Sequence, residues 1–142
     1  MQKNELHRGR LIDHIGLAVE DFPACRRFYE AVFGALNIPI GGSSEDDLWV
    51  DELFISSLDS AAVQGRPTGR HHLAFQAASR AMVDEFYSAG MANGGSDNGP
   101  PGERAYHPGY YAAFLIDPAG NNIEAVYHGE ANRSAASVTI TF

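Results

Sequence analysis

Cysteine is nearly absent from this chain of 142 residues, since Cys25 is the only one. A single cysteine excludes an internal disulfide and a metal cluster built from several thiolates. Its scarcity favours a reducing compartment, and we expect a cytoplasmic protein. Cys25 falls within an expected helix and has no histidine near it in the sequence, so we interpret it as a packed helix residue rather than a nucleophile.

Long hydrophobic runs and clusters of positive charge are also missing. No apolar stretch is long enough to span a bilayer, and residues 1–10 are polar, unlike the apolar core of a signal peptide. The ten basic residues are scattered and the formal net charge is −8. Because a nucleic-acid surface needs clustered lysine and arginine, the sequence predicts neither a nucleic-acid nor a membrane partner.

What the chain does contain is an internal repeat. A shift of 58 residues, the separation of His14 and His72, also places the dipeptide Phe28–Tyr29 on Phe86–Tyr87 without a gap. A chance match would not keep a histidine and an aromatic pair in one register. The sequence therefore predicts a duplicated unit.

Each copy begins with a strand, predicted from apolar residues at alternate positions over 11–19 and 71–77. Bulky apolar side chains share one face of each strand, and His14 or His72 lies on the other face beside small residues. A helix follows in both copies, with Asp21 or Ser79 suited to accept from its first free backbone N–H groups.

Short strands are predicted after each helix, near 38–40, 47–50 and 53–57 in the first copy and near 110–116 and 121–128 in the second. Residues 97–104, rich in glycine and proline, predict a loop. The fold class is therefore α+β, with two βαβββ modules in one domain spanning 1–142. Module 1 covers about 10–58, a linker about 59–68, module 2 about 69–129 and a tail 130–142. The final SVTITF predicts an extra strand with no identified partner.

The last strand of the second copy carries Glu124 between Ile123 and Ala125, in an apolar setting. An ionised carboxylate resists burial unless it is paired or bound to a metal. Two imidazoles and a carboxylate on strands can hold a divalent cation and leave positions open for water or substrate. His14, His72 and Glu124 are therefore candidate metal ligands, against the alternative that each histidine is simply a packed side chain.

The segments IDHIGLAVEDFPACRRFYEAVFG, HHLAFQA and YHPGYYAAFLIDPAGNNIEAVYH resemble those of the vicinal oxygen chelate superfamily of glyoxalases, bleomycin-resistance proteins and extradiol dioxygenases. The resemblance covers about 11–128, and DPxGNxIE is its most specific part. It implies modules whose sheets curl into a mixed-sheet cup around a divalent metal, with ligands at His14, His72 and Glu124. These ligand types do not separate Fe, Mn, Zn, Ni and Co. The family's habit also implies a homodimer.

For activity, the resemblance implies a metal-dependent isomerase, lyase or dioxygenase acting on a small substrate through two vicinal oxygens. Glu124 would be a ligand and, in an isomerase, would also move protons. His107, which follows Tyr106 before the PGYY turn, is a second candidate catalytic group or a substrate contact. The alternative is a bleomycin-resistance-like protein that binds a small molecule or antibiotic without metal or turnover.

Two points stay open in the sequence. Glyoxalase I-like members have a fourth ligand, a glutamate, on the last strand of the first module, and Glu52 lies either there or in the preceding hairpin turn. In the turn case the facing residue is Trp49 or Phe54, neither of which can ligate, and we expect three ligands. The site is complete either within one chain or only across two. His71, His7 and His128 have weaker claims; the last two lack an evident partner.

Overall fold

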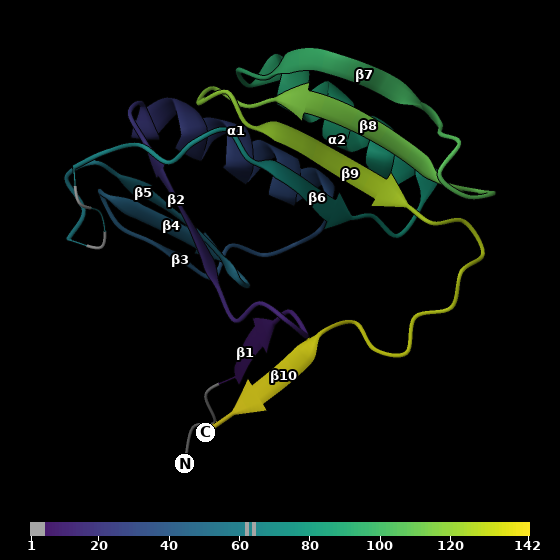
Figure 1. Ribbon diagram of the computed structural model, residues 1–142, viewed down its shortest axis with the longest axis horizontal. Helices are drawn as coiled ribbons and strands as arrows, with labels where there is room; N and C mark the ends of the chain where they lie inside the picture. The colour runs from purple at the N-terminus through teal and green to yellow at the C-terminus, as the bar shows by residue number, and fades with distance from the viewer. Residues whose placement is uncertain (1–4, 62, 64) are drawn as a thin grey trace.

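The structure is a computed structural model, and it describes residues 5–61, 63 and 65–142. The predicted fold class is confirmed: two βαβββ modules follow one another along the chain (Figure 1). The first comprises β2 (Ile15–Val19), α1 (Phe22–Ala35), β3 (Gly42–Ser43), β4 (Asp47–Val50) and β5 (Leu53–Ser57). The second comprises β6 (His72–Gln76), α2 (Arg80–Ala92), β7 (Ser96–Glu103), β8 (Tyr111–Ile116) and β9 (Asn122–Tyr127).

Each module folds its strands into its own open, curled four-stranded sheet. The strand orders are β2-β5-β4-β3 and β6-β9-β8-β7, and in both sheets the first strand pairs parallel with the last strand of its module. The first strands, β2 and β6, are consequently edge strands of two different sheets. This placement separates His14, just before β2, from His72, the first residue of β6.

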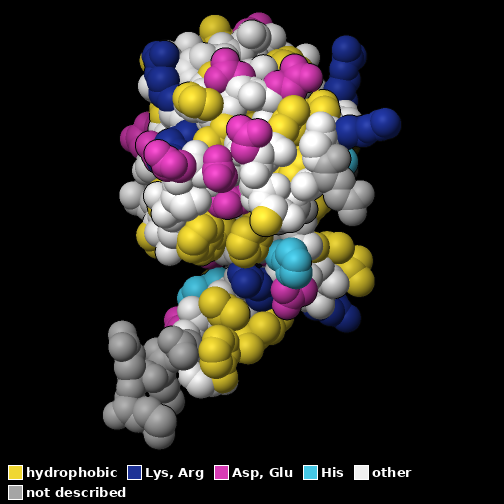
Figure 2. All heavy atoms as spheres, turned by 90° about the vertical axis from the view of Figure 1, so that its left-hand side faces the viewer, with side chains coloured by type: hydrophobic (Ala, Val, Ile, Leu, Met, Phe, Trp, Pro, Cys, Tyr) yellow, Lys and Arg dark blue, Asp and Glu magenta, His cyan; other side chains and the backbone are white. Residues whose placement is uncertain are grey.

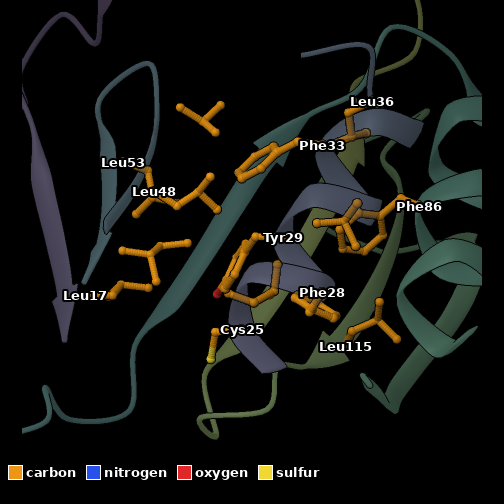
Figure 3. Close-up of a cluster of buried hydrophobic side chains, with 14 of the residues drawn as sticks. Leu17, Cys25, Phe28, Tyr29, Phe33, Leu36, Leu48, Leu53, Phe86 and Leu115 are labelled. Atoms are coloured by element: carbon orange, nitrogen blue, oxygen red, sulfur yellow. The ribbon is translucent and has the colours of Figure 1, made fainter. Parts of the chain in front are cut away.

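The two helices begin where the sequence predicts. The side chain of Asp21 accepts from the backbone N–H of Ala24, and that of Ser79 accepts from the N–H of Met82. The helices pack on each other and bury a shared core, in which the repeat-related Phe28 and Phe86 both have no exposed surface (Figure 3).

Cys25 lies in this core, fully buried, which confirms its interpretation as a packed residue. Burial, reinforced by the negative charges of Asp117 and Asp21, raises the pKa of its thiol to about 12.

The DPxGN turn holds the two modules together. Asp117 is buried and accepts the Tyr29 hydroxyl of α1 at 2.5 Å, the side-chain N–H of Asn121 at 2.9 Å, and the backbone N–H groups of Ala119 and Asn121 at 2.8 Å. These donors compensate the cost of burying the carboxylate. The most specific part of the family motif is therefore a structural joint, with Glu124 on the strand that leaves it.

Two strand predictions are wrong. Residues 97–104 are not a loop, because 96–103 form β7, which pairs with β8 through register shifts around Gly99. An edge strand with bulges tolerates glycine and proline, which the sequence pattern assigned to a turn. No strand forms at 38–40; the short β3 begins instead at Gly42, where Trp49 of β4 lies opposite it.

The chain ends form a separate two-stranded arm. The tail forms β10 (Val138–Thr141), and its partner is β1 (Glu5–Arg8), which the sequence did not indicate. The arm extends from the body (Figure 1), and hydrophobic side chains gather on its surface (Figure 2). Exposed apolar residues of the arm and the segment after β1 are Leu11, Ile12, Val138, Ile140 and Phe142. Neither helix of the described chain is long and apolar enough to cross a membrane.

Candidate metal centre

The second sheet brings two of the three predicted ligands together. His72 Nε2 lies 3.0 Å from Glu124 Oε1. The glutamate side chain is only 3% exposed, whereas that of His72 is 50% exposed. The strand neighbours of Glu124, Ile123 and Ala125, belong to the core shared with the helices, so the alternation along β9 places Glu124 on the opposite face, next to Ala74 and Phe114. A buried carboxylate thus lies beneath an accessible imidazole.

The tautomer of His72 follows from its second hydrogen bond. Its Nδ1 is 3.0 Å from the backbone carbonyl oxygen of Asn122. A carbonyl can only accept, so Nδ1 carries the hydrogen and donates. In the neutral imidazole Nε2 then holds a lone pair that faces a carboxylate oxygen, and two acceptors at 3.0 Å repel each other. The pair requires a cation between the two atoms, either a proton or a metal ion.

Tyr110, which the sequence analysis did not select, holds the other oxygen of the carboxylate. Its hydroxyl donates a short hydrogen bond to Glu124 Oε2. Burial, together with the hydrogen bond and charge of Glu124, raises the pKa of the Tyr110 phenol well above its usual range. Tyr110 therefore remains a donor at any physiological pH. Its sequence signal was its place at the start of the strand that pairs with the glutamate strand.

Two further histidines lie against Tyr110. His107 Nε2 is 2.8 Å from His128 Nδ1, and the centroids of both rings lie within 5.4 Å of that of Tyr110. His107 Nδ1 is 2.8 Å from the carbonyl oxygen of Pro108 and so carries the hydrogen. In the neutral pair His128 therefore donates to His107. The sequence interpretation that His128 lacks a partner is wrong, because the turn closed by the Tyr110 N–H on the His107 carbonyl brings His107 to it.

His14 lies apart from this group, on the other sheet. Its Nδ1 is 2.7 Å from Asp13 Oδ1 and its side chain is 63% exposed. The hydrogen bond lowers the pKa of the Asp13 carboxyl, which is therefore an acceptor that fixes the hydrogen on Nδ1 of His14. Nε2 is left with a lone pair. Within the described part of one chain, no three histidine, cysteine, aspartate or glutamate side chains are grouped closely enough to hold a metal ion.

Glu52 is located in the turn between β4 and β5, not on a strand. The strand residue that faces His14 is Phe54, whose ring lies 5.6 Å from the imidazole and stacks on Trp49 at 6.0 Å. Phe54 lies opposite Gly16 as Glu124 lies opposite Ala74, and the 58-residue shift relates Gly16 to Ala74. Phe54 thus takes the place that Glu124 has in the second module.

A cavity bordered by both modules and the arm lies elsewhere. It has a volume of about 800 Å³ and is lined by the edge strand β6, the beginning of β2, the turn at Glu52, and the segments leading into and out of the arm. None of His14, His72 or Glu124 lines it. It opens beside β2 and β6, the two edge strands that begin at or directly after the separated histidines.

Comparison with known proteins identifies the family. The sequence pattern of the Glyoxalase/Bleomycin resistance protein/Dioxygenase superfamily matches residues 11–125. A glyoxalase/bleomycin resistance protein from Albidiferax ferrireducens T118 is similar in structure, with a TM-score of 0.66 and 30% identity over 82% of this chain and 97% of that one. No curated protein matches the sequence.

Two other solved structures share the fold at lower identity. A glyoxalase-related enzyme from Fulvimarina pelagi has a TM-score of 0.66 and 17% identity over 92% of this chain and 97% of its own. A lactoylglutathione lyase from Agrobacterium tumefaciens has a TM-score of 0.59 and 22% identity over 82% of this chain and 92% of its own. With its duplicated modules and the match over nearly its whole repeat, the chain belongs to the glyoxalase/bleomycin resistance protein/dioxygenase superfamily.

Proposed function

We propose that the protein is a divalent-metal-dependent enzyme that acts on a small substrate through two vicinal oxygens. Its protein ligands would be Nε2 of His14, Nε2 of His72 and Oε1 of Glu124. The observation that carries the proposal is the 3.0 Å approach of His72 Nε2 to a buried carboxylate oxygen while His72 Nδ1 is committed to a carbonyl. A cation resolves that contact, and the half-exposed imidazole makes the position accessible.

The donor set fits a divalent transition metal. Metal-binding histidines commonly donate their second N–H to a carboxylate or a carbonyl, which fixes the ring and the tautomer. His14 does so to Asp13 and His72 does so to the carbonyl of Asn122. Two imidazoles and one carboxylate suit Fe, Mn, Co, Ni or Zn and leave coordination positions open. A metal bound there would supply a Lewis acid that polarises substrate oxygens.

A second copy of the chain would complete the site. His14 and the His72–Glu124 pair flank edge strands of separate sheets, so one chain does not join them. In a two-fold dimer, β2 of each copy can lie against β6 of the other and bring His14 to the opposite pair. The 800 Å³ cavity beside these edges and the apolar arm offer surface for such a contact. An isolated two-stranded sheet is marginally stable, which also favours an arm packed on a partner.

The remaining polar groups have separate roles. Tyr110 would hold Glu124 by Oε2, so that Oε1 alone points to the metal. In the neutral pair the Nδ1–H of His128 donates to Nε2 of His107, which leaves a free lone pair on Nε2 of His128. We assign this pair the acid–base role, with His107 stabilising the proton that His128 accepts. Glu124, as a ligand, would move a proton only when it leaves the metal.

The test is elemental analysis of the purified protein after reconstitution with each candidate ion. We expect about one metal ion per chain in the wild type and loss of metal in folded His14→Ala, His72→Ala and Glu124→Ala variants. Retained metal in all three variants would contradict the ligand assignment. If the wild type binds no metal under any reconstitution, the enzyme proposal is wrong, and a small-molecule-binding protein of the bleomycin-resistance kind takes its place.

The dimer has an independent test in the arm. Removal of residues 137–142 deletes β10 and leaves β1 unpaired. If the arm packs on the second copy, the truncated protein should show a lower mass or a weaker dimer by light scattering at equal concentration. An unchanged dimer mass would show that the arm is not part of the dimer interface.

A further inference from the structure

Arg104 places a positive charge on the same face of the second sheet as the His72–Glu124 pair. It follows β7, and its guanidinium carbon lies 5.4 Å from the centroid of the Phe114 ring. Phe114 lies opposite Glu124 between β8 and β9, and its ring stacks on His72 with a centroid separation of 6.1 Å. The strand order therefore places Phe114 between His72, from one edge of the sheet, and Arg104, from the other.

Two glycines of β7 provide the room for this guanidinium. A Cβ at Gly99 would lie 3.2 Å from Arg104 Nη2 and equally close to Phe114 Cδ1, and a Cβ at Gly102 would lie 3.1 Å from Arg104 Nη1. A side chain at either position would be in tight contact with the arginine, and at Gly99 also with the ring. Nη2 donates to the carbonyl oxygen of Pro100 at 2.7 Å, and Nη1 donates more weakly to that of Glu103 at 3.4 Å. The guanidinium is held in place before any ligand arrives.

The charge of Arg104 is not neutralised in the described part of the chain, where no ion pair includes it. Arg80 is the contrast: it also lies over a tyrosine ring, Tyr111 at 4.7 Å, but it is paired with Glu103 at 2.6 Å. Arg104 is half-buried. An unpaired cation on the same face as the candidate metal position, across the Phe114 ring from it, is complementary to an anion.

The geometry points to Arg104 as the anchor for a carboxylate of the substrate. Each terminal nitrogen gives one N–H to a backbone carbonyl and keeps another, and a guanidinium binds a carboxylate through two such N–H groups. The ligand would then be a small molecule that carries a carboxylate in addition to its two vicinal oxygens. The two vicinal oxygens in this assignment rest on the proposed function, whereas the carboxylate rests on the charge of Arg104.

The experiment uses two probes of nearly the same shape, 3,4-dihydroxybenzoate and 3,4-dihydroxybenzamide, which differ in charge. Their affinities for the reconstituted protein are measured by titration calorimetry without oxygen. We expect the benzoate to bind about 10- to 100-fold more tightly, the range of a hydrogen-bonded charge. Arg104→Gln should make the two affinities equal, and Arg104→Lys should restore part of the difference.

Arg80→Gln is the matched control, because Arg80 has the same kind of ring contact but an existing carboxylate partner. It should leave the preference unchanged, and thermal unfolding shows whether each variant is folded. Equal affinities in the wild type, no binding of the benzoate at millimolar concentration, or a preference that survives Arg104→Gln would overturn the proposal. Metal content of the same samples separates the outcomes. Protein that lacks metal but keeps the Arg104-dependent preference would overturn the proposed function and leave the anchor standing.

Discussion

The two modules have the same architecture but different open faces. Both place a histidine at the start of an edge strand and pair that strand with the last one of the module. At equivalent positions of that last strand, the first module has Phe54, stacked on Trp49, and the second has the buried Glu124. The carboxylate of Glu124 is contacted by the Tyr110 hydroxyl and the His72 imidazole.

The packed faces match at some repeat-related positions and differ at others, since the buried Phe33 corresponds to the exposed Met91. Phe28 and Phe86 are fully buried, and so are Cys25 and Val83, which the 58-residue shift also relates. At the matching positions the exchange of Cys for Val keeps a buried side chain of similar size and apolar character, which a core tolerates. The open face is free of this constraint. In the proposed function, the chemistry would therefore depend on a few residues of the second module, supplemented by His14 of the first.

The largest effect should come from removing the side chains that distinguish the modules. Glu124→Ala should abolish metal binding, because it removes the carboxylate ligand of the proposed site and leaves His72 without its counterpart. Phe54→Ala, at the equivalent position, should keep the metal. Equilibrium dialysis with the reconstituting ion measures both. Equal loss in the two variants would mean that the modules contribute alike.

Tyr110→Phe should have the next largest effect. Removing the hydroxyl that holds Glu124 Oε2 should weaken metal binding by about 10- to 100-fold, which is typical of groups that orient a ligand. Tyr111→Phe is the control, since its hydroxyl donates at 2.7 Å to Asp84 of α2, away from the site. If both variants bind metal equally well, Tyr110 does not position the carboxylate.

Phe54→Glu would make the first module resemble the second. A carboxylate at this position faces His14 and offers a fourth ligand, so we expect metal binding to tighten by about tenfold. Phe54→Gln, which has similar size without the charge, is the matched control. Unchanged affinity in Phe54→Glu would place position 54 outside the coordination sphere in the assembled protein.

The smallest effect concerns stability in alkali. Burial raises the pKa of Cys25 to about 12 from an ordinary value of 9.0, so the thiol ionises more readily in the unfolded chain. Its contribution is fully present below pH 9 and is lost as the pH rises towards 12. Cys25→Val, which copies Val83, should differ by less than about 1.5 kcal/mol at pH 7 and should be less sensitive to that rise. Urea unfolding at several pH values measures this, and parallel pH profiles would contradict it.

Much of the fold was predictable because each sequence pattern occurs in both copies of the repeat, so that one copy supports the interpretation of the other. The shift that aligned His14 with His72 also located both helices, whose caps at Asp21 and Ser79 form as expected. The strand β7 was missed because glycine and proline normally mark turns. Here they lie in a strand with bulges, and two of the glycines leave room for the Arg104 side chain. The partner of the tail was missed because β1 is short, polar and far from it in the sequence.

The candidate site was predictable only as residue types. The sequence indicated three ligands, and the structure brings His72 and Glu124 together while leaving His14 on another sheet. That separation depends on how the modules pack, which no local pattern encodes. Tyr110 and His128 were missed for a related reason: their significance comes from contacts across a turn with Glu124 and His107.

The central claim, a metal site shared between two chains, is tested most directly by mixing two inactive variants. His14→Ala and His72→Ala protein are each expected to bind no metal; they are combined in equal amounts, unfolded, refolded together and reconstituted. If the site is shared, half of the dimers pair the two variants and regain one intact site of two, so about a quarter of the wild-type metal should return. If one chain builds the whole site, every site keeps a defect and no metal should return, which would contradict the account.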